Sequence, residues 1–222
     1  MDRTVLLKVC SNGMREPGAH PALPVTPDQL GQDTAAAVAA GAAAAHVHPR
    51  GPDGRQTLAA GPCGHAVASL RAACPGIPVG LTTGAWIEPD PARRLAMVEQ
   101  WLILPDFVSV NLGEPGAVRL AGLLSERGIG LELGLWNPDD AQLLVRSGLA
   151  GRRLRVMLVP QDDDPAAALA NADATERVLT GAGVSARLLL HGMEGVLQAD
   201  ADAEARRLAA ERGVTLARAP VG

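Results

Sequence analysis

The alternation of short apolar runs with amphipathic stretches constrains the fold of this chain more than any other feature. Most pairs of neighbouring apolar runs are separated by a stretch with apolar residues at three- and four-residue spacing, which is typical of a helix. Eight runs are predicted to be strands: TVLLKVC (4–10), AAAAHVH (42–48), IPVGLTT (77–83), DFVSVNL (106–112), IGLELGLW (129–136), RLRVMLV (153–159), ARLLLHG (186–192) and GVTLARA (213–219).

The helical stretches carry start and stop signals. The stretch 26–41 begins with Thr26, has a proline in its first turn and ends at a glycine. Five more stretches follow the same pattern, several of them starting with Asp, Asn or Pro: 90–102, 116–128, 137–148, 164–183 and 201–213.

Eight strands and about seven helices in alternation predict an α/β fold of the (β/α)8 TIM barrel type, with residues 1–222 as a single domain. A doubly wound open sheet is the rival fold, and the absence of a GxGxxG motif after the first strand argues against it. The sequence stops just past the eighth strand, so we expect the closing helix of the barrel to be missing.

Charge and composition exclude several classes of protein. The net charge is −4 with no basic stripe, and the chain has three Trp, one Phe and no Tyr, so a nucleic-acid partner is not expected. No run of 18 strongly apolar residues predicts a membrane span, and the N-terminus lacks the layout of a signal peptide. The three cysteines form no CxxC pair. We therefore expect a reduced, cytoplasmic protein.

Two of the five histidines stand two residues apart at the end of the second strand. His46 and His48 would point to the same face of that strand, because side chains alternate along it, and both imidazoles could bind one divalent ion such as zinc. Two histidines hydrogen-bonded to neighbouring strand ends would give the same pattern. The spacing alone leaves both interpretations open.

Other strand ends add polar side chains. The hydroxyl and amide groups of Thr82, Ser109 and Asn111 could serve chemistry or ordinary cap and turn hydrogen bonds. Glu132 lies between two leucines, where a carboxylate is costly to bury without a partner. Arg50 has the planar fork that suits a substrate carboxylate or phosphate.

The segment 20–58 resembles the opening of the β-keto acid cleavage enzyme family, which includes 3-keto-5-aminohexanoate cleavage enzyme. The family pattern runs from His-Pro-x-x-Pro-x-Thr-Pro, here 20–27, through a helix to Ala-Gly-Ala at 40–42. It continues as His-x-His-x-Arg, here 46–50, with a downstream Asp53 and Gly54. The stretches TTGAW, SVNLGEPG, LELGLW and LLLHG extend the similarity in order, convincingly over residues 4–160.

The resemblance implies a zinc-dependent (β/α)8 enzyme that condenses a β-keto acid with acetyl-CoA to give acetoacetate and a new CoA thioester, and it suggests a homo-oligomer. It makes His46 and His48 metal ligands. It places Thr82, Ser109 and Arg218 among the catalytic groups. We assign Arg50, Asn111 and Glu132 to substrate binding.

The sequence departs from the family at the eighth strand. Family members carry Arg-x-Gly-Φ-Glu-Asp there, whose Glu is the third zinc ligand, whereas this sequence reads ARAPVG, with Arg218 at the Arg position and Gly222 at that of the Glu. His191 and Glu132 are the candidates to replace it. A degenerate relative that keeps the barrel for binding or assembly, a two-histidine metal hydrolase and a sequence truncated after residue 222 are the alternatives.

Overall fold

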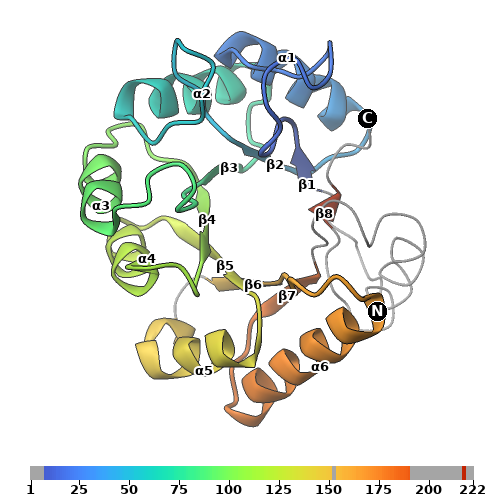
Figure 1. Ribbon diagram of the computed structural model, residues 1–222. Helices are drawn as coiled ribbons and strands as arrows, with labels where there is room; N and C mark the ends of the chain where they lie inside the picture. The colour runs from blue at the N-terminus through green and yellow to red at the C-terminus, as the bar shows by residue number, and fades with distance from the viewer. Residues whose placement is uncertain (1–7, 152–153, 191–216, 219–222) are drawn as a thin grey trace. The chain divides into compact units, whose positions relative to one another are not determined.

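The computed structural model describes residues 8–151, 154–190 and 217–218 (Figure 1). The chain divides into two compact bodies. The N-terminal body comprises residues 6–109 with 218–222, and the C-terminal body comprises residues 1–5 with 110–217.

The N-terminal body is a parallel sheet whose strands are joined by helices. Its strands are β1 (Lys8–Cys10), β2 (Ala44–Val47), β3 (Val79–Thr82) and the first part of β4 (Phe107–Asn111), and its helices are α1 (Pro27–Ala39), α2 (Ala60–Ala73) and α3 (Pro91–Glu99). β1 pairs with β2, β2 with β3 and β3 with β4, all in parallel. Sequence neighbours are therefore sheet neighbours, as expected for βαβ units.

The two faces of this sheet differ in chemistry. Every residue of β2 and β3 is buried, which is typical of parallel strands covered on both sides. The residues of one face are apolar, as in Val47, Leu81 and Val108, which are completely buried. The opposite face carries polar side chains, including that of His46.

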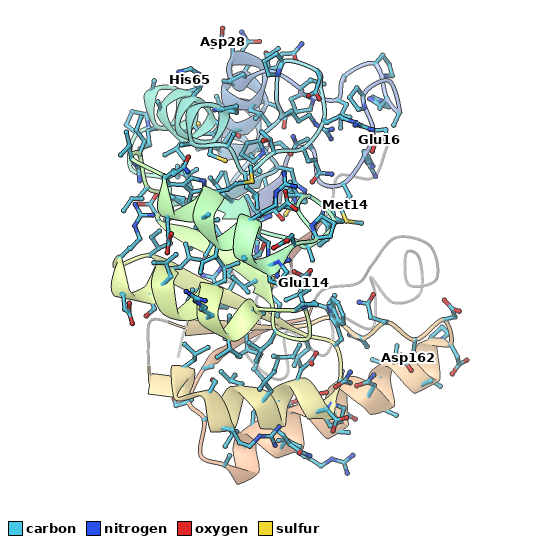
Figure 2. All side chains as sticks on the ribbon, turned by 60° about the vertical axis from the view of Figure 1, so that its left-hand side comes forward. Met14, Glu16, Asp28, His65, Glu114 and Asp162 are labelled. Carbon is cyan, nitrogen blue, oxygen red and sulfur yellow. The ribbon has the colours of Figure 1, made fainter. Side chains whose placement is uncertain are left out.

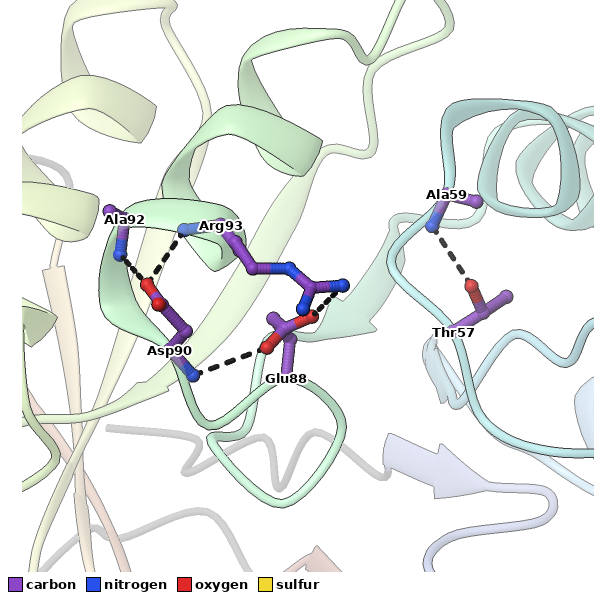
Figure 3. A network of polar contacts seen from close by, with 6 residues as sticks. All are labelled: Thr57, Ala59, Glu88, Asp90, Ala92 and Arg93. Carbon is purple, nitrogen blue, oxygen red and sulfur yellow. Dashed lines mark hydrogen bonds and ion pairs between the residues drawn. The ribbon is translucent and has the colours of Figure 1, made fainter.

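Side-chain caps explain why α1 and α3 begin where they do. Thr26 and Gln29 form a reciprocal capping box at the start of α1, with Thr26 Oγ1 accepting from the Gln29 N–H at 3.2 Å. Asp90 accepts from two backbone N–H groups in the first turn of α3, one of them that of Arg93 (Figure 3). Both starts agree with the sequence pattern.

The start of α2 has no such signal. Its N-cap is Ala59, which has no side-chain oxygen, and the ranges predicted from the sequence leave this helix out. The Ala59 N–H is instead bound by the Thr57 hydroxyl at 3.1 Å (Figure 3). α2 lies beside α1 (Figure 1), where Ser69 Oγ donates to the Pro27 carbonyl at 2.8 Å.

The C-terminal body continues the alternation. It contains the end of β4, then α4 (Ala117–Glu126), β5 (Gly130–Leu135), α5 (Pro138–Ser147), a short 3-10 turn (Leu149–Gly151), β6 (Leu154–Leu158), α6 (Pro165–Gly181) and β7 (Arg187–Leu190). β5, β6 and β7 pair in parallel, and the Leu112 N–H donates to the Gly134 carbonyl at 2.8 Å. α5 and α6 lie side by side (Figure 1).

Each of the eight predicted strands overlaps a strand of the structure, the last being β8 (Ala217–Arg218). Parts of the first, sixth, seventh and eighth predicted strands lie outside the described residues. The predicted helix 201–213 lies outside the described residues. Within the described part of the chain, no helix combines the length and the apolar character that crossing a membrane requires.

Candidate functional site

The polar face of the N-terminal sheet is built by strand register. His46 on β2 lies opposite Cys10 on β1 and Gly80 on β3, and Gly80 in turn lies opposite Phe107 on β4. Paired residues of a parallel sheet share a face, so these side chains form one layer across four strands. The four residues of this layer differ in polarity, so strand register and not shared chemistry brings them together.

Gly80 allows Phe107 to reach His46 across β3. A Cβ atom on Gly80 would lie 2.1 Å from the Phe107 ring, so only glycine leaves room for the ring at this place. The Phe107 and His46 rings stack with centroids 6.4 Å apart and an angle of 29° between their planes. The ammonium of Lys8 lies 5.8 Å from the centroid of the same phenyl ring. Packing thus fixes the orientation of the buried His46 ring.

His48 stands just past the end of β2, held through its backbone. The Asn12 side chain donates to the His48 carbonyl at 2.8 Å and accepts from the His48 N–H at 2.9 Å. Asn12 is 2% exposed, so both bonds are shielded from water. The Asn12 amide therefore continues the β1–β2 hydrogen bonding by one step and sets the direction of the His48 side chain.

The two imidazoles face each other closely. Their centroids are 5.3 Å apart and the rings meet edge to face at 80°. Both residues are buried, His46 at 6% and His48 at 7% exposure. Two neutral imidazoles held on one face of a strand end are suitable as two of the ligands of a zinc ion.

A complete ligand set is not assembled by the described residues. Among residues 8–151, 154–190 and 217–218, no three His, Cys, Asp or Glu side chains gather closely enough to hold a metal ion. The histidine pair fits as part of a metal site, and further ligands would have to join it.

The loop after His48 returns to the strand end as a hairpin. The Thr57 N–H donates to the Pro49 carbonyl at 2.9 Å, and Arg50 and Gln56 form an antiparallel bridge. Gly54 has a φ of 78°, which glycine adopts without strain and which turns the chain at the tip.

Arg50 ties this loop to a second one. Its guanidinium donates to the Gly54 carbonyl at 3.0 Å and to the Arg15 carbonyl. Burial lowers the pKa of the Arg50 guanidinium, and the negative charge of Glu16, which lies on the loop with Met14 (Figure 2), opposes that shift. The described hydrogen bonds of Arg50 all serve the loops, and its role in substrate binding stays a prediction.

The returning loop places Gln56 against the His48 ring. Gln56 Oε1 lies 2.8 Å from His48 Nδ1 and accepts from Trp86 Nε1 at 3.1 Å. The Trp86 indole also stacks on the His48 ring, with centroids 6.2 Å apart and an angle of 23° between the planes. The His48 ring is thus held by its backbone, by one ring nitrogen and by one face.

Thr82 and Ser109 lie in register with each other, two residues beyond Gly80 and Phe107. Their side chains therefore belong to the same face of the sheet as His46. Thr82 is buried, and its hydroxyl accepts a long 3.4 Å hydrogen bond from the Gly84 N–H. The structure brings these two predicted residues to the end of the sheet at which His48 stands.

Asn111 and Glu132 belong to the C-terminal body. Asn111 donates to Glu114 at 2.8 Å, and Glu132 forms an ion pair with Arg155 on β6. Glu132 is 2% exposed, so the partner that its burial requires is provided by the neighbouring strand.

Three further residues discussed from the sequence lie wholly or partly outside the described residues. His191 and the C-terminal Gly222 lie outside the described residues, as does the side chain of Arg218, whose backbone belongs to β8. Their roles stay predictions.

Four residues around the histidines do not follow from the sequence pattern. They are Asn12, Gln56, Trp86 and Phe107. The loop sequence RGPDG, with Asp and Gly at a turn, could have indicated a hairpin that returns to the strand end. No local signal indicates which side chain the hairpin delivers.

A comparison with protein families matches residues 4–161 to BKACE, the beta-keto acid cleavage enzyme. This match covers more than half of the chain and includes every strand from β1 to β6. The chain belongs to the β-keto acid cleavage enzyme family. The resemblance found in residues 20–58 is thereby confirmed.

One curated relative in this family is the 3,5-dioxohexanoate:acetyl-CoA acetone transferase of Paraburkholderia graminis. It is 33% identical to the chain over 113 residues. The matched stretch covers 50% of this chain and 36% of the relative, so it spans only about a third of the relative's length.

Solved structures with a similar fold are barrel-like enzymes of other sequence families. The N-acetylmannosamine-6-phosphate 2-epimerase of Clostridium perfringens matches with a TM-score of 0.60 at 11% identity, covering 96% of this chain and 86% of its own. A mandelate racemase/muconate lactonizing enzyme from Roseiflexus matches with a TM-score of 0.57 at 17% identity, covering 96% of this chain and 55% of its own. At such identities the likeness concerns the fold alone. This chain has a parallel half-barrel of strands alternating with helices, which resembles TIM-barrel enzymes.

Proposed function

We propose that this chain is a zinc-dependent β-keto acid cleavage enzyme that transfers the acyl part of a β-keto acid to CoA. The reaction takes a β-keto acid and acetyl-CoA to acetoacetate and a new acyl-CoA. Membership of the family supports the reaction class. The name of the Paraburkholderia graminis relative includes acetyl-CoA and a β-keto acid. The observation that supports zinc binding is the pair of imidazoles, whose ring centroids are 5.3 Å apart and which Asn12 and Phe107 orient.

We also propose an architecture for the chain. The chain forms a single (β/α)8 barrel over residues 1–222, in which the strand ends collect the catalytic groups. It acts in the cytoplasm as a homo-oligomer.

The residues of the chain have separate roles in this scheme. His46 and His48 hold the zinc ion, which when bound polarises the keto oxygen of the substrate. Thr82 and Ser109 donate or accept hydrogen bonds at the reacting carbonyls, and Arg218 stabilises developing negative charge.

Substrate binding falls to Arg50, Asn111 and Glu132. Arg50 supports the loop beside His48. Asn111 is the last residue of β4, and Glu132 is the third residue of β5, where its ion pair with Arg155 holds its side chain in place. His191 or Glu132 supplies a third metal ligand.

A degenerate relative without catalysis is the second candidate. It is favoured by the missing third ligand among the described residues and by the engagement of Glu132 with Arg155. This alternative predicts a folded protein that forms no acetoacetate.

Metal content and turnover together test the proposal. Wild-type protein should hold one zinc ion per chain and form acetoacetate from acetyl-CoA and at least one β-keto acid in a panel. His46→Ala and His48→Ala should lose both, while His65→Ala, at an exposed position on α2 (Figure 2), should lose neither. Zinc without turnover would favour the degenerate relative, and absence of stoichiometric zinc would overturn the metal-dependent mechanism. Hydrolysis of the substrate without CoA transfer would indicate a metal hydrolase.

A further inference from the structure

The hydrogen bonds at Gln56 determine which nitrogen of His48 carries its proton. Trp86 Nε1–H is a donor only, so the Gln56 atom 3.1 Å away is the amide oxygen. The same oxygen lies 2.8 Å from His48 Nδ1. An oxygen without a hydrogen can only accept, so Nδ1 carries the proton and donates it to Gln56. In the neutral ring, Nε2 then carries no proton.

The position of Gln56 is itself fixed on two sides. The Arg50–Gln56 bridge holds its backbone in the hairpin after β2. Trp86 approaches from the loop after β3, where it folds back over Gly84. A Cβ atom on Gly84 would lie 2.2 Å from the indole, so this conformation of Trp86 needs a glycine there.

We propose that Gln56, oriented by Trp86, is a positioning residue that locks His48 in the Nδ1–H tautomer and presents Nε2 as the metal-binding atom. Metal-binding histidines commonly donate their second ring nitrogen to an oxygen acceptor, which fixes the ring and raises its basicity. The inference rests on the proposed function where it makes His48 a metal ligand. The tautomer itself is a property of the metal-free protein.

Nitrogen NMR of the imidazoles in metal-free protein tests the tautomer directly. We expect the His48 signals, identified by their loss in His48→Ala, to show the proton on Nδ1 in wild-type protein. Gln56→Glu keeps an oxygen acceptor and should keep that tautomer. Gln56→Met has a side chain of similar length without this acceptor and should shift His48 toward the Nε2–H form. A proton on Nε2 of His48 in wild-type protein would overturn the proposal.

Trp86→Phe separates the hydrogen bond of Trp86 from its stacking. The phenyl ring can still lie on His48, but it has no N–H to select the oxygen of Gln56. We expect a mixture of His48 tautomers, between wild type and Gln56→Met. An unchanged tautomer would show that Trp86 does not orient Gln56.

Zinc affinity, measured by competition with a chromophoric chelator, tests the consequence for the metal. Gln56→Met should weaken zinc binding by about 10- to 100-fold, and Gln56→Glu should restore it. The same substitution at an exposed glutamine of the same body, Gln100→Met, should change nothing. If wild-type protein binds no zinc, the proposed function fails while the tautomer result stands. If wild type and Gln56→Met bind zinc equally, the positioning role fails.

Discussion

The absence of a side chain at Gly80 leaves the space that the Phe107 ring occupies. A rigid ring close to the position of a Cβ atom cannot move away without disturbing its own neighbours. Gly80 has no positive φ, so its importance is steric and not conformational. The stacking of Phe107 on His46 depends on this one missing atom.

Gly80→Ala should therefore destabilise the protein by about 1–3 kcal/mol, the usual effect of overpacking a core. Denaturant unfolding measures the change. Gly122→Ala is the matched control, because a Cβ atom at Gly122 in α4 meets no atom within 4 Å. Alanine there should stabilise the helix by about 0.5–1 kcal/mol.

The effect of Gly80→Ala should also depend on the ring. In a Phe107→Leu background the added methyl group meets a smaller, flexible side chain, so its cost should fall. Equal costs in both backgrounds would contradict the steric explanation.

The residues that sequence could predict are those set by strand periodicity. His46 and His48 share a face because they are two apart on a strand, and a strand alternates wherever it occurs. Gln56 and Trp86 reach His48 from two loops, so their placement depends on turn geometry and on space left by Gly84. The sequence next to His48 predicts neither this turn geometry nor the space at Gly84.

At the scale of elements, the ion pair of Glu132 and Arg155 joins β5 to β6. The two residues lie opposite each other in the strand register. Their burial is unequal, since the Glu132 side chain is 2% exposed and that of Arg155 is 23% exposed. Removing Arg155 should therefore affect stability differently from removing Glu132.

Arg155→Met should cost about 3–5 kcal/mol of unfolding free energy, because a deeply buried carboxylate loses its cation. Glu132→Leu should cost less, since the guanidinium left behind can still reach water. The double variant should recover much of the loss. Thermal and urea unfolding of all three variants measure this, and additive costs would show that the pair contributes no coupling.

Element boundaries were predictable where caps mark them. Asp90 and Asn137 each accept from two backbone N–H groups at the start of a helix and Asp164 accepts from one, and each is followed by a proline. α2 starts at an alanine cap and contains Gly61 and Pro62 in its first turn, so its sequence lacks the usual start signal. Tertiary packing of its buried apolar side chains forms this helix where local signals do not.

At the scale of the whole molecule, Cys63 should make stability depend on alkaline pH. Burial in α2 raises the pKa of its thiol to about 12 from the ordinary value of 9.0, and the thiol donates to the Thr57 carbonyl at 3.6 Å. The unfolded chain loses this proton near pH 9, but the folded chain keeps it. Stability therefore falls as the pH rises from about 9 to about 12.

Between pH 7.5 and pH 10, the Cys63 contribution should lower the unfolding free energy by about 1.4 kcal/mol. Urea unfolding at both pH values measures the loss, with Cys63→Ala as the control that lacks this titration. A wild-type loss no larger than that of Cys63→Ala would contradict the prediction.

The hairpin of residues 49–57 limits how variants of this chain can be designed. Because the Arg50–Gln56 bridge sets the direction of Gln56, a pairing slip by one residue would turn its side chain to the other side of the hairpin. Pro52 at the tip is exposed and tolerates exchange, whereas the exposed Asp53 accepts a hydrogen bond from the Arg55 N–H at 3.1 Å and supports the turn. Variant libraries at this loop should therefore randomise residue identity and keep the number of residues constant. Loop grafts from relatives should be chosen by hairpin register before sequence similarity.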